Sequence, residues 1–346
     1  MKDLIRKEAG ERVYEFITQH VELDGKGLVV STSIMFNILN APKRSYCYII
    51  NLKRINDIRF LNKFFEAVNE KLYNEGIFIG CVETYPLRKK KILKKYIPPI
   101  NYLVYTVDFI FKRIVPKLPI LKKIYFSITQ GNNRVLSRAE TFGRLYSCGF
   151  ILINEIFING YHYWTARKVK EPLYPNNPTY GLFVRLQRIG KDGNVINVYK
   201  LRTMHAYSEY LQDYIFKQND LEEGGKFRED FRITTLGKFF RVLWLDELPM
   251  FINVFIKNNM KIVGVRPLSQ HYYELYDTAL RKKRIQFKPG LIPPYYAQFP
   301  TPRSLEEIQK NEKEYLEAYQ KRPFLTDLRY FFKALINIVF RRVRSK

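Results

Sequence analysis

Residues 46–82 read YCYIINLKRINDIRFLNKFFEAVNEKLYNEGIFIGCV, and this stretch decides the fold of the N-terminal half. Tyr46–Leu52 is a short apolar run with β-branched residues, which predicts a buried strand. Asn56–Leu72 carries apolar residues at helical spacing, and Gly76–Val82 (GIFIGCV) predicts another strand. A strand, a helix and a strand in this order predict a parallel βαβ unit.

A helix and a hairpin are expected further along the chain. Ala139–Cys148 has the pattern of a helix. Phe150–Asn154 and Tyr161–Ala166, separated by Asn159–Gly160, predict the two strands of a hairpin. The N-terminal half is therefore expected to be a Rossmann-like α/β domain.

An apolar and aromatic segment interrupts this domain. Tyr96–Phe126 contains two prolines within Val115–Pro119, which predicts two short amphipathic helices with a break between them. Such a pair could lie in a membrane interface or dip into one leaflet, and the alternative is a helical hairpin packed on the soluble core. We therefore expect a Rossmann-like domain over residues 1–95 and 129–173, with a membrane-associating insertion over residues 96–128.

A second domain is expected after a turn-rich linker. Tyr174–Pro178 (YPNNP) marks the boundary, so this domain is expected to span residues 174–346. Lys191–Gly193 predicts a hairpin turn, and a helix is expected from about residue 245 to residue 255.

The charge of the chain indicates the kind of partner that it binds. The net charge is +26 over 346 residues, which implies an anionic partner. Basic runs flank apolar segments, as where the amphipathic pattern of Leu328–Phe340 is followed by RRVRSK at residues 341–346. Such flanks suit a surface of anionic membrane lipid, and core packing is the alternative explanation of the apolar stripe. Nucleic acid is not expected, because the aromatic residues lie in apolar runs rather than among Lys and Arg as stacking platforms.

The cysteines and the apolar runs indicate the cellular setting. Cys47, Cys81 and Cys148 form neither a metal pattern nor a disulfide framework, which indicates a reducing compartment. Met1–Lys7 is charged and lacks the apolar core of a signal peptide. No stretch reaches 18 clean apolar residues, so a conventional membrane-spanning helix is not expected.

Asp246 and Glu247 are adjacent carboxylates within the sequence LDELP. An isolated pair of this kind usually caps a helix and complements its dipole. Cations surround this pair in the sequence, at Arg232, Lys238, Arg241 and Arg266. A carboxylate among cations at a helix N-terminus is expected to keep a low pKa and stay ionised. Asp246 could then attack phosphorus as a nucleophile while Glu247 holds a divalent cation.

Basic residues recur on the expected hairpin and after a glycine. The element RLQRIG contributes Arg185 and Arg188, and YKLRTM contributes Lys200 and Arg202. These residues are expected to point along one face and to clamp a diphosphate, and the alternative is an ordinary basic hairpin. In the element GVRP, a glycine that allows close backbone approach precedes Arg266, a residue suited to phosphate.

Four motifs follow one another in the C-terminal half: RLQRIGKDG, YKLRTM, FRITTLGKFFRVLWLDELPMFINVF and MKIVGVRPL. Together and in this order, they resemble the bacterial sugar transferase family, the monotopic phosphoglycosyl transferases. The resemblance covers about residues 180–290 and implies a small α+β domain. It implies an enzyme that moves a sugar-1-phosphate from a UDP-sugar to polyprenyl (undecaprenyl) phosphate, releasing UMP through a covalent aspartyl-phosphosugar intermediate. Such an enzyme initiates glycan synthesis at the cytoplasmic face of the bacterial inner membrane, where it is held without a full membrane span.

The resemblance also assigns roles to single residues. Asp246 corresponds to the nucleophile, and Glu247 corresponds to the residue that helps to hold Mg²⁺. The positions assigned to the substrate phosphates or the nucleotide are Arg185, Arg188, Lys200, Arg202, Arg241 and Arg266. The family usually carries a re-entrant helix directly before the RQxRxG element, where this chain has the hairpin pattern of Phe150–Lys168. The membrane element is therefore expected at Tyr96–Phe126 instead.

The N-terminal half resembles, more faintly, the later part of a class I methyltransferase, from YCYIINL to TARKV. The glycine-rich loop that would cradle a methyl donor is missing from residues 1–41, so we expect this half to serve as a scaffold or a partner surface. Two alternatives to sugar transfer stay open: a non-catalytic membrane scaffold, and a SAM-dependent methyltransferase of the same pathway. The sugar and the oligomeric state also stay open, with a homodimer among the candidates.

Overall fold

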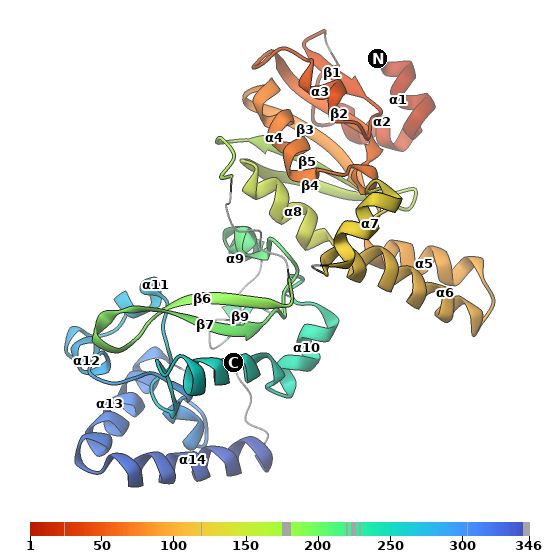
Figure 1. Cartoon of the computed structure of the whole chain (residues 1–346). Coiled ribbons are helices and arrows are strands. Elements are labelled where there is room, and N and C mark those ends of the chain that lie inside the picture. The colour runs from red at the N-terminus through yellow and green to blue at the C-terminus, as the bar shows by residue number, and fades with distance from the viewer. Residues whose placement is uncertain are drawn as a thin grey trace. The chain divides into compact units, whose positions relative to one another are not determined.

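The computed structural model describes residues 1–23, 25–118, 120–174, 181–218, 221–222, 226–227, 230–302 and 304–341. The chain divides into two compact units (Figure 1). Unit 1 comprises residues 1–180 and 205–214, and unit 2 comprises residues 181–204 and 215–346. Both units combine helices and strands, so the expected mixed α/β character is confirmed. Among the described residues, no helix combines the length and the apolar composition needed to cross a membrane.

The described part of unit 1 is built on a five-stranded sheet. Its strands are β1 (Gly27–Val30), β2 (Tyr46–Arg54), β3 (Leu72–Val82), β4 (Phe150–Ile158) and β5 (Tyr161–Lys168). They lie in the order β1-β2-β3-β5-β4, with β1, β2 and β3 parallel and β5 antiparallel to both of its neighbours. The expected parallel βαβ unit over residues 46–82 and the expected hairpin after residue 149 are therefore confirmed.

Helices cover both faces of this sheet. They are α1 (Lys2–Ala9), α2 (Glu11–Thr18), α3 (Phe36–Leu39), α4 (Leu61–Lys71), α5 (Tyr85–Lys95), α6 (Ile100–Phe109), α7 (Leu121–Thr129) and α8 (Arg138–Ser147), with short turns η1 (Ile55–Asp57), η2 (Ile110–Ile114), η3 (Val115–Lys117) and η5 (Ser208–Leu211). On one face, α1 and α2 pack with residues such as Phe16 against Tyr48 of β2. On the opposite face, Phe65 of α4 makes T-shaped, edge-to-face contacts with Phe78 and Trp164. Large aromatic side chains thus fill the core beneath α4.

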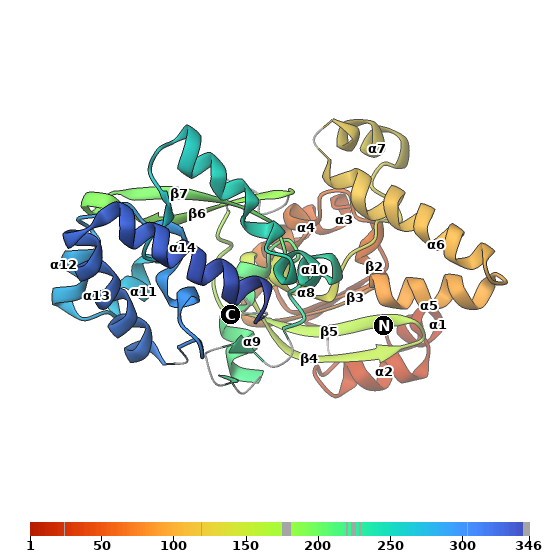
Figure 2. The ribbon, with the colours of Figure 1, turned by 90° about the horizontal axis from the view of Figure 1, so that it is seen from below.

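The expected insertion has the form that its prolines predict. It comprises α6, η2, η3 and α7, with the break after η3, and Pro119 lies outside the described residues. α5 and α6 lie side by side and project from the sheet of unit 1 in both views (Figure 1, Figure 2). The segment is anchored to unit 1, because Arg88 Nε donates to Asp108 Oδ2 at 2.6 Å and Tyr125 is buried. Its exposed large apolar residues include Ile97, Ile100, Leu103, Val107, Ile120, Ile124 and Ile128.

Two parts of unit 1 were not anticipated. The described residues 1–23 and 25–41 contain α1, α2, β1 and α3, although the sequence predicted no element there. Residues 205–214, which were expected within the C-terminal domain, belong to unit 1. Their Tyr207 and Leu211 are buried, and a Cβ on Gly143 of α8 would lie 2.1 Å from the Tyr207 carbonyl oxygen. This close approach explains why a glycine occupies α8 at that position.

Unit 2 combines short strands with helices and tight turns. Its strands are β6 (Phe183–Ile189), β7 (Val195–Leu201), β8 (Leu221–Glu222), β9 (Lys226–Phe227), β10 (Lys261–Val263) and β11 (Gly290–Ile292). Its helices are α10 (Thr235–Val242), α11 (Gln270–Glu274), α12 (Thr278–Arg284), α13 (Leu305–Lys321) and α14 (Pro323–Val339), and α9 (Gln212–Gln218) begins in unit 1. Its short turns are η4 (Lys191–Gly193), η6 (Leu245–Met250), η7 (Ile252–Ile256) and η8 (Pro294–Ala297). The expected hairpin is confirmed, since β6 and β7 pair antiparallel around η4.

The helix expected at residues 245–255 is only partly right. The chain forms a 3₁₀ turn, η6, followed by a π-helical turn, η7. Pro249 lies inside η6. Because proline has no backbone N–H and its ring crowds the preceding turn, a regular α-helix does not form through this point. Met250 then packs with Val198 of β7 in a buried cluster.

α14 turns the large apolar residues of the expected tail helix outward. Its buried residues are Thr326, Ala334 and Asn337, and Asn337 donates to the Tyr296 carbonyl oxygen at 2.9 Å. Its exposed large residues include Leu328, Phe332, Leu335, Ile336 and Val339. Core packing accounts for Phe331, which packs against the buried cluster of Tyr315 and Leu316, but not for most of the apolar stripe. Of the basic run that follows, residues 342–346 lie outside the described residues, as does most of the expected linker at Tyr174–Pro178.

A buried amide holds the free edge of β7. Asn253 of η7 has an exposed fraction of 0%. Its Oδ1 accepts from the Tyr199 N–H at 3.0 Å, and its Nδ2 donates to the Asn197 carbonyl oxygen at 2.7 Å. The side chain thus makes hydrogen bonds to two backbone groups of β7 that do not bond to β6.

We predict that Asn253→Ala lowers the free energy of unfolding by about 2–4 kcal/mol, because two buried backbone groups lose their partners and a cavity is left. Urea unfolding measures the change. Asn194→Ala, at an exposed position of the same hairpin, should stay within about 0.5 kcal/mol of the parent. Equal unfolding midpoints for the two variants would contradict the role of Asn253.

Candidate active site

The hairpin of β6 and β7 divides the expected basic cluster between its two faces. Arg188 and Lys200 share the face that packs on the core of unit 2. Arg185 lies on the other face, opposite Tyr199, with its guanidinium carbon 5.8 Å from the ring centroid. The expectation of one common face is wrong, because side chains alternate along a strand and Arg185 and Arg188 are three residues apart.

The acidic pair lies in a tight turn after α10. Trp244 adopts a left-handed backbone with φ of 61° and precedes η6, which contains Asp246 and Glu247. The Glu247 N–H donates to the Trp244 carbonyl oxygen at 3.1 Å. Asp246 is the second residue of this turn and does not occupy the N-cap position, which Trp244 takes. Helix capping, the ordinary explanation of such a pair, therefore does not account for Asp246.

Lys200 joins the hairpin to this turn. Its Nζ donates to Glu247 Oε1 at 2.6 Å, and the two side chains are 20% and 11% exposed. An ion pair with this little exposure is screened less by solvent than a pair on the surface. The positive charge of Lys200 also acts on the carboxyl of Asp246. One lysine thus serves both members of the acidic pair.

Arg241 acts on the same carboxyl from the last turn of α10. Its Nε donates to Thr203 Oγ1 at 3.0 Å, and its charge favours the ionised form of Asp246. α10 begins at Thr234, whose Oγ1 accepts from the Gly237 N–H at 2.8 Å. The Thr234 N–H donates to the Thr203 carbonyl oxygen at 2.9 Å. Thr203 therefore holds α10 near both of its ends.

Burial raises the pKa of Asp246 above its ordinary value. Lys200 and Arg241 lower it, whereas the neighbouring charge of Glu247 adds to the increase. The expectation that the cations keep this pKa low is wrong, because the loss of hydration outweighs their attraction. The carboxyl of Asp246 is therefore more basic than that of an ordinary aspartate.

Arg188 and Arg266 bring excess positive charge to one place. Burial lowers the pKa of Arg188, and the charge of Arg266 lowers it further. The carbonyl oxygen of Arg266 accepts from Arg284, which pairs with the buried carboxylate of Glu312. The side chain of Arg266 is exposed and lies within the influence of Glu247. Two guanidinium groups that repel each other suit the binding of a diphosphate, because its negative charges offset the repulsion.

The remaining cations of the expected site lie elsewhere. Arg202 Nε donates to the Gly181 carbonyl oxygen at 2.9 Å, and Arg232 makes two hydrogen bonds of 2.8 Å to Asp230. Lys238 is exposed. The structure therefore groups six of the eight candidate residues and leaves out Arg185 and Arg202. The grouped residues are Arg188, Lys200, Arg241, Asp246, Glu247 and Arg266.

The acidic pair is also the candidate metal site. The described residues contain no group of three or more His, Cys, Asp or Glu side chains that could hold a metal ion. Mg²⁺ usually takes one or two carboxylates and completes its shell with water and substrate phosphates. Asp246 and Glu247 fit this donor set together with a phosphorylated substrate. The repulsion between their charges, which raises the pKa of Asp246, would decrease beside a cation.

Three residues of the site were not assigned from the sequence. Thr203 anchors Arg241, Trp244 supplies the left-handed turn before η6, and the Tyr295 hydroxyl lies 3.5 Å from the Arg266 guanidinium. The sequence contains one signal for the contact of Thr203 with α10. Thr234 is a typical helix N-cap, and Gly237, three residues later, allows another backbone segment to approach the helix closely.

A family model and several known proteins resemble parts of this chain. Residues 175–341 match the family model described as bacterial sugar transferase. The galactosyl transferase CpsE of Streptococcus agalactiae serotype III is 38% identical over 105 residues, which cover 30% of this chain and 23% of that protein. The undecaprenyl-phosphate galactose phosphotransferase of Salmonella typhimurium is 36% identical over 95 residues, 26% of this chain and 20% of that protein.

A longer match is the UDP-glucose:undecaprenyl-phosphate glucose-1-phosphate transferase of Escherichia coli K12. It is 29% identical over 251 residues, which cover 68% of this chain and 48% of that protein. The chain thus spans less than half the length of these three relatives. Among solved structures, a T. thermophilus 16S rRNA methyltransferase covers 57% of this chain with 9% identity and a TM-score of 0.22. That similarity is too low to indicate a common fold, so the methyltransferase resemblance stays a prediction.

We predict that Gly237→Ala destabilises the protein by about 1–3 kcal/mol, because the new Cβ would lie 2.0 Å from the Thr203 carbonyl oxygen. Alanine ordinarily stabilises a helix interior by about 1 kcal/mol relative to glycine, so the sign of the change is diagnostic. Urea unfolding is the measurement, and Leu236→Ala, an exposed position of the same helix, is the control. A midpoint for Gly237→Ala at or above that of the parent would show that α10 does not depend on this contact.

Proposed function

We propose that residues 175–341, which match the model of the bacterial sugar transferase family, transfer a sugar-1-phosphate from a UDP-sugar to polyprenyl phosphate, releasing UMP. Two relatives whose names specify transfer to undecaprenyl phosphate support this reaction. The observation that carries the proposal is the environment of Asp246, a half-buried carboxyl beside Glu247 and under the charges of Lys200 and Arg241.

In the first step, a carboxylate oxygen of Asp246 attacks the β-phosphorus of the UDP-sugar. The bond from that phosphorus to the oxygen that bridges to the α-phosphate breaks, and UMP leaves with the bonding electron pair. The sugar phosphate is then joined to Asp246 as an acyl phosphate. The attacking carboxylate is ionised, so this step requires no base to remove a proton from it.

In the second step, an oxygen of polyprenyl phosphate attacks the same phosphorus. The bond between Asp246 and phosphorus breaks, and the carboxylate is regenerated. The product is a polyprenyl diphospho-sugar. Both steps exchange one phosphorus–oxygen bond for another, so neither needs an oxidant or a reductant.

The cations of the site bind and orient the charged groups. Arg188 and Arg266 are placed to bind the diphosphate, and their mutual repulsion decreases when an anion is bound. Lys200 fixes one oxygen of Glu247 through its 2.6 Å hydrogen bond. Glu247, together with Asp246, would hold Mg²⁺, which when bound neutralises phosphate charge as the diphosphate is broken.

We place this reaction at a membrane surface, because its acceptor is a lipid. The exposed apolar residues of α14 and of the insertion, such as Phe332 and Leu103, suit an interface. Lys90 and Lys94 on α5 are exposed close in sequence to the insertion and would attract anionic lipid. Peripheral attachment is therefore the form of membrane association that we propose.

We predict that Asp246→Asn lowers UMP release by about 10³-fold or more, because the amide lacks the nucleophilic oxygen. The assay combines membrane-extracted protein, Mg²⁺, undecaprenyl phosphate and a panel of UDP-sugars. Asp192→Asn makes the same change at an exposed turn residue with φ of 58°, where asparagine is tolerated, and should keep the parent rate. If Asp246→Asn released UMP at the parent rate, the nucleophile would be another residue.

We predict that the acid limb of the pH–rate profile lies above the ordinary aspartate value of about 3.9, because the pKa of Asp246 is raised and the step needs its ionised form. Lys200 lowers this pKa, so Lys200→Met should raise it and move the acid limb to higher pH. The measurement is kcat/KM for UMP release between about pH 4 and pH 8, because the pH dependence of kcat/KM reports the pKa of the free enzyme. Lys191→Met, at an exposed hairpin position, should leave the limb in place, and a limb that moves to lower pH in Lys200→Met would refute this electrostatic role.

A further inference from the structure

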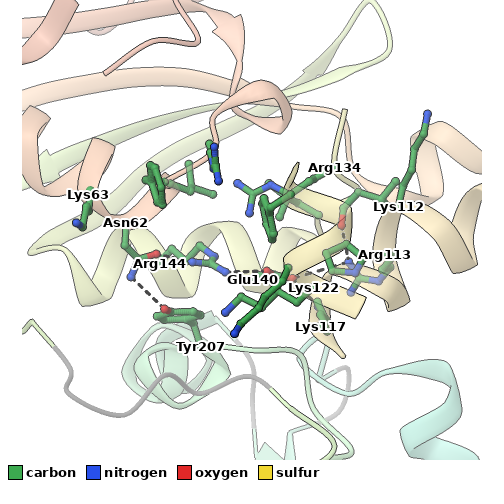
Figure 3. Close-up of a pocket in the computed structure, with 18 residues that line it drawn as sticks. Asn62, Lys63, Lys112, Arg113, Lys117, Lys122, Arg134, Glu140, Arg144 and Tyr207 are labelled. Atoms are coloured by element: carbon green, nitrogen blue, oxygen red, sulfur yellow. Dashed lines mark hydrogen bonds and ion pairs between the residues drawn. The ribbon is translucent and has the colours of Figure 1, made fainter. Parts of the chain in front are cut away.

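Unit 1 contains a cavity of about 560 Å³ (Figure 3), and all of the described residues that line it belong to this unit. This volume lies within the range of about 300–1,000 Å³ that is typical of small-molecule sites. Residues 59–63, which follow β2 through η1, form part of its wall. Leu136, another wall residue, bridges to Thr84 directly after β3. The cavity therefore lies at the carboxyl ends of parallel strands, the edge at which open α/β sheets bind ligands.

The wall of this cavity is strongly cationic. Of the eighteen described residues that line it, nine are Lys or Arg and one, Glu140, is acidic. The cations come from three separate parts of the chain: residues 59–63 at the start of α4, the insertion, and α8 together with the segment that leads into it. Phe60, Pro116 and Phe126 add apolar surface to the same wall. Positive charge next to apolar surface suits an anion that carries an apolar or aromatic group.

Three cations converge on the single carboxylate of Glu140, which is 2% exposed (Figure 3). Lys117 Nζ lies 3.0 Å from its Oε2, Arg144 lies 3.0 Å from its Oε1, and Arg113 lies 3.8 Å from its Oε2. Arg113 also donates to the Val135 carbonyl oxygen and lies 2.9 Å from His205 Nδ1. One carboxylate thus lies among three cations, so positive charge predominates in this poorly hydrated place.

The titration of neighbouring groups agrees with this excess. Burial lowers the pKa of Lys117 to about 8, and the charges of Arg113 and Arg144 act in the same direction despite Glu140. Burial, together with the charges of Arg113 and Lys117, lowers the pKa of His205 to about 3, so this histidine is neutral at neutral pH. A second anion in the cavity would offset the repulsion among these cations.

We propose that this cavity binds a phosphate-bearing anion, with the phosphate against the cations around Glu140 and the remainder of the ligand against Phe60 and Phe126. The ligand chemistry is a phosphate monoester or diphosphate with an apolar or aromatic portion. A nucleotide or another phosphorylated metabolite supplies this chemistry in solution, and a lipid headgroup supplies it at a membrane. The site is distinct from the acidic pair of unit 2, so it does not depend on the reaction proposed above.

Acetylation of Lys117 in the full-length protein tests this proposal. Its amine, with a pKa of about 8, is partly neutral and therefore reactive at pH values near 7.5. Mass spectrometry follows the modification in the presence of inorganic pyrophosphate, of UDP, or of phosphatidylcholine vesicles with and without phosphatidylglycerol. We expect protection of Lys117 by at least one phosphate-bearing probe. Protection by the soluble probes identifies a free metabolite, and protection by the anionic vesicles alone identifies a lipid.

Matched variants separate the cavity from the overall charge. Lys63 and Lys123 are exposed residues of the cavity wall, and the double variant K63Q/K123Q should need about fivefold more probe for half-protection. K7Q/K53Q removes the same charge from exposed positions of α1 and β2 outside the wall and should behave as the parent does. Asp246→Asn should leave protection unchanged, which separates this test from that of the transferase reaction. No protection by any probe, or an equal loss in both double variants, would overturn the proposal.

Discussion

The ion pair between Lys200 and Glu247 sets the geometry on which the acidic site depends. Without it, β7 and η6 would meet through apolar contacts such as that between Val198 and Met250, and the hydrophobic effect is not directional. A hydrogen-bonded pair of 2.6 Å selects one residue of the turn to face the hairpin. Because Asp246 directly precedes Glu247 in η6, the same bond determines where the proposed nucleophile lies. Asn253 supports this arrangement, since its amide holds the edge of the strand that carries Lys200.

Periodicity and turn residues predicted much of the fold, because each depends on neighbours in sequence. The βαβ unit over residues 46–82 and both hairpins follow from local patterns, and the structure contains them. The acidic pair was also proposed from the sequence, through the order of motifs around it, and its catalytic role stays a prediction. The common face for Arg185 and Arg188 was not correct, although the period of a strand already separates them. The direction of the pKa change at Asp246 could not be predicted, because it depends on burial, and burial is a property of the folded chain.

Other features depend on contacts between distant parts of the sequence. The cations around Glu140 come from distant parts of the sequence, and only the fold brings the insertion next to α8. The net charge of +26 is therefore not a uniform surface property. Part of this positive charge is concentrated where cations outnumber carboxylates. One such place is near Glu140 in unit 1, and another is near Arg188 and Arg266 in unit 2. Composition predicted an anionic partner, and the structure indicates where positive charge is left to meet one.

The chain passes between its two units three times, after residues 180, 204 and 214. The middle excursion supplies unit 1 with Tyr207, whose hydroxyl accepts from Asn62 at 3.1 Å and whose ring lies 4.3 Å from the guanidinium carbon of Arg144. A gene fragment that ended near residue 180 would encode unit 1 without this tyrosine, and its α8 would lose the backbone against which Gly143 is fitted. A single recombination event between the two units would thus produce two incomplete halves. The two units can therefore be inherited intact only together, unless a second event also moves residues 205–214, which belong to unit 1 but lie within the sequence of unit 2.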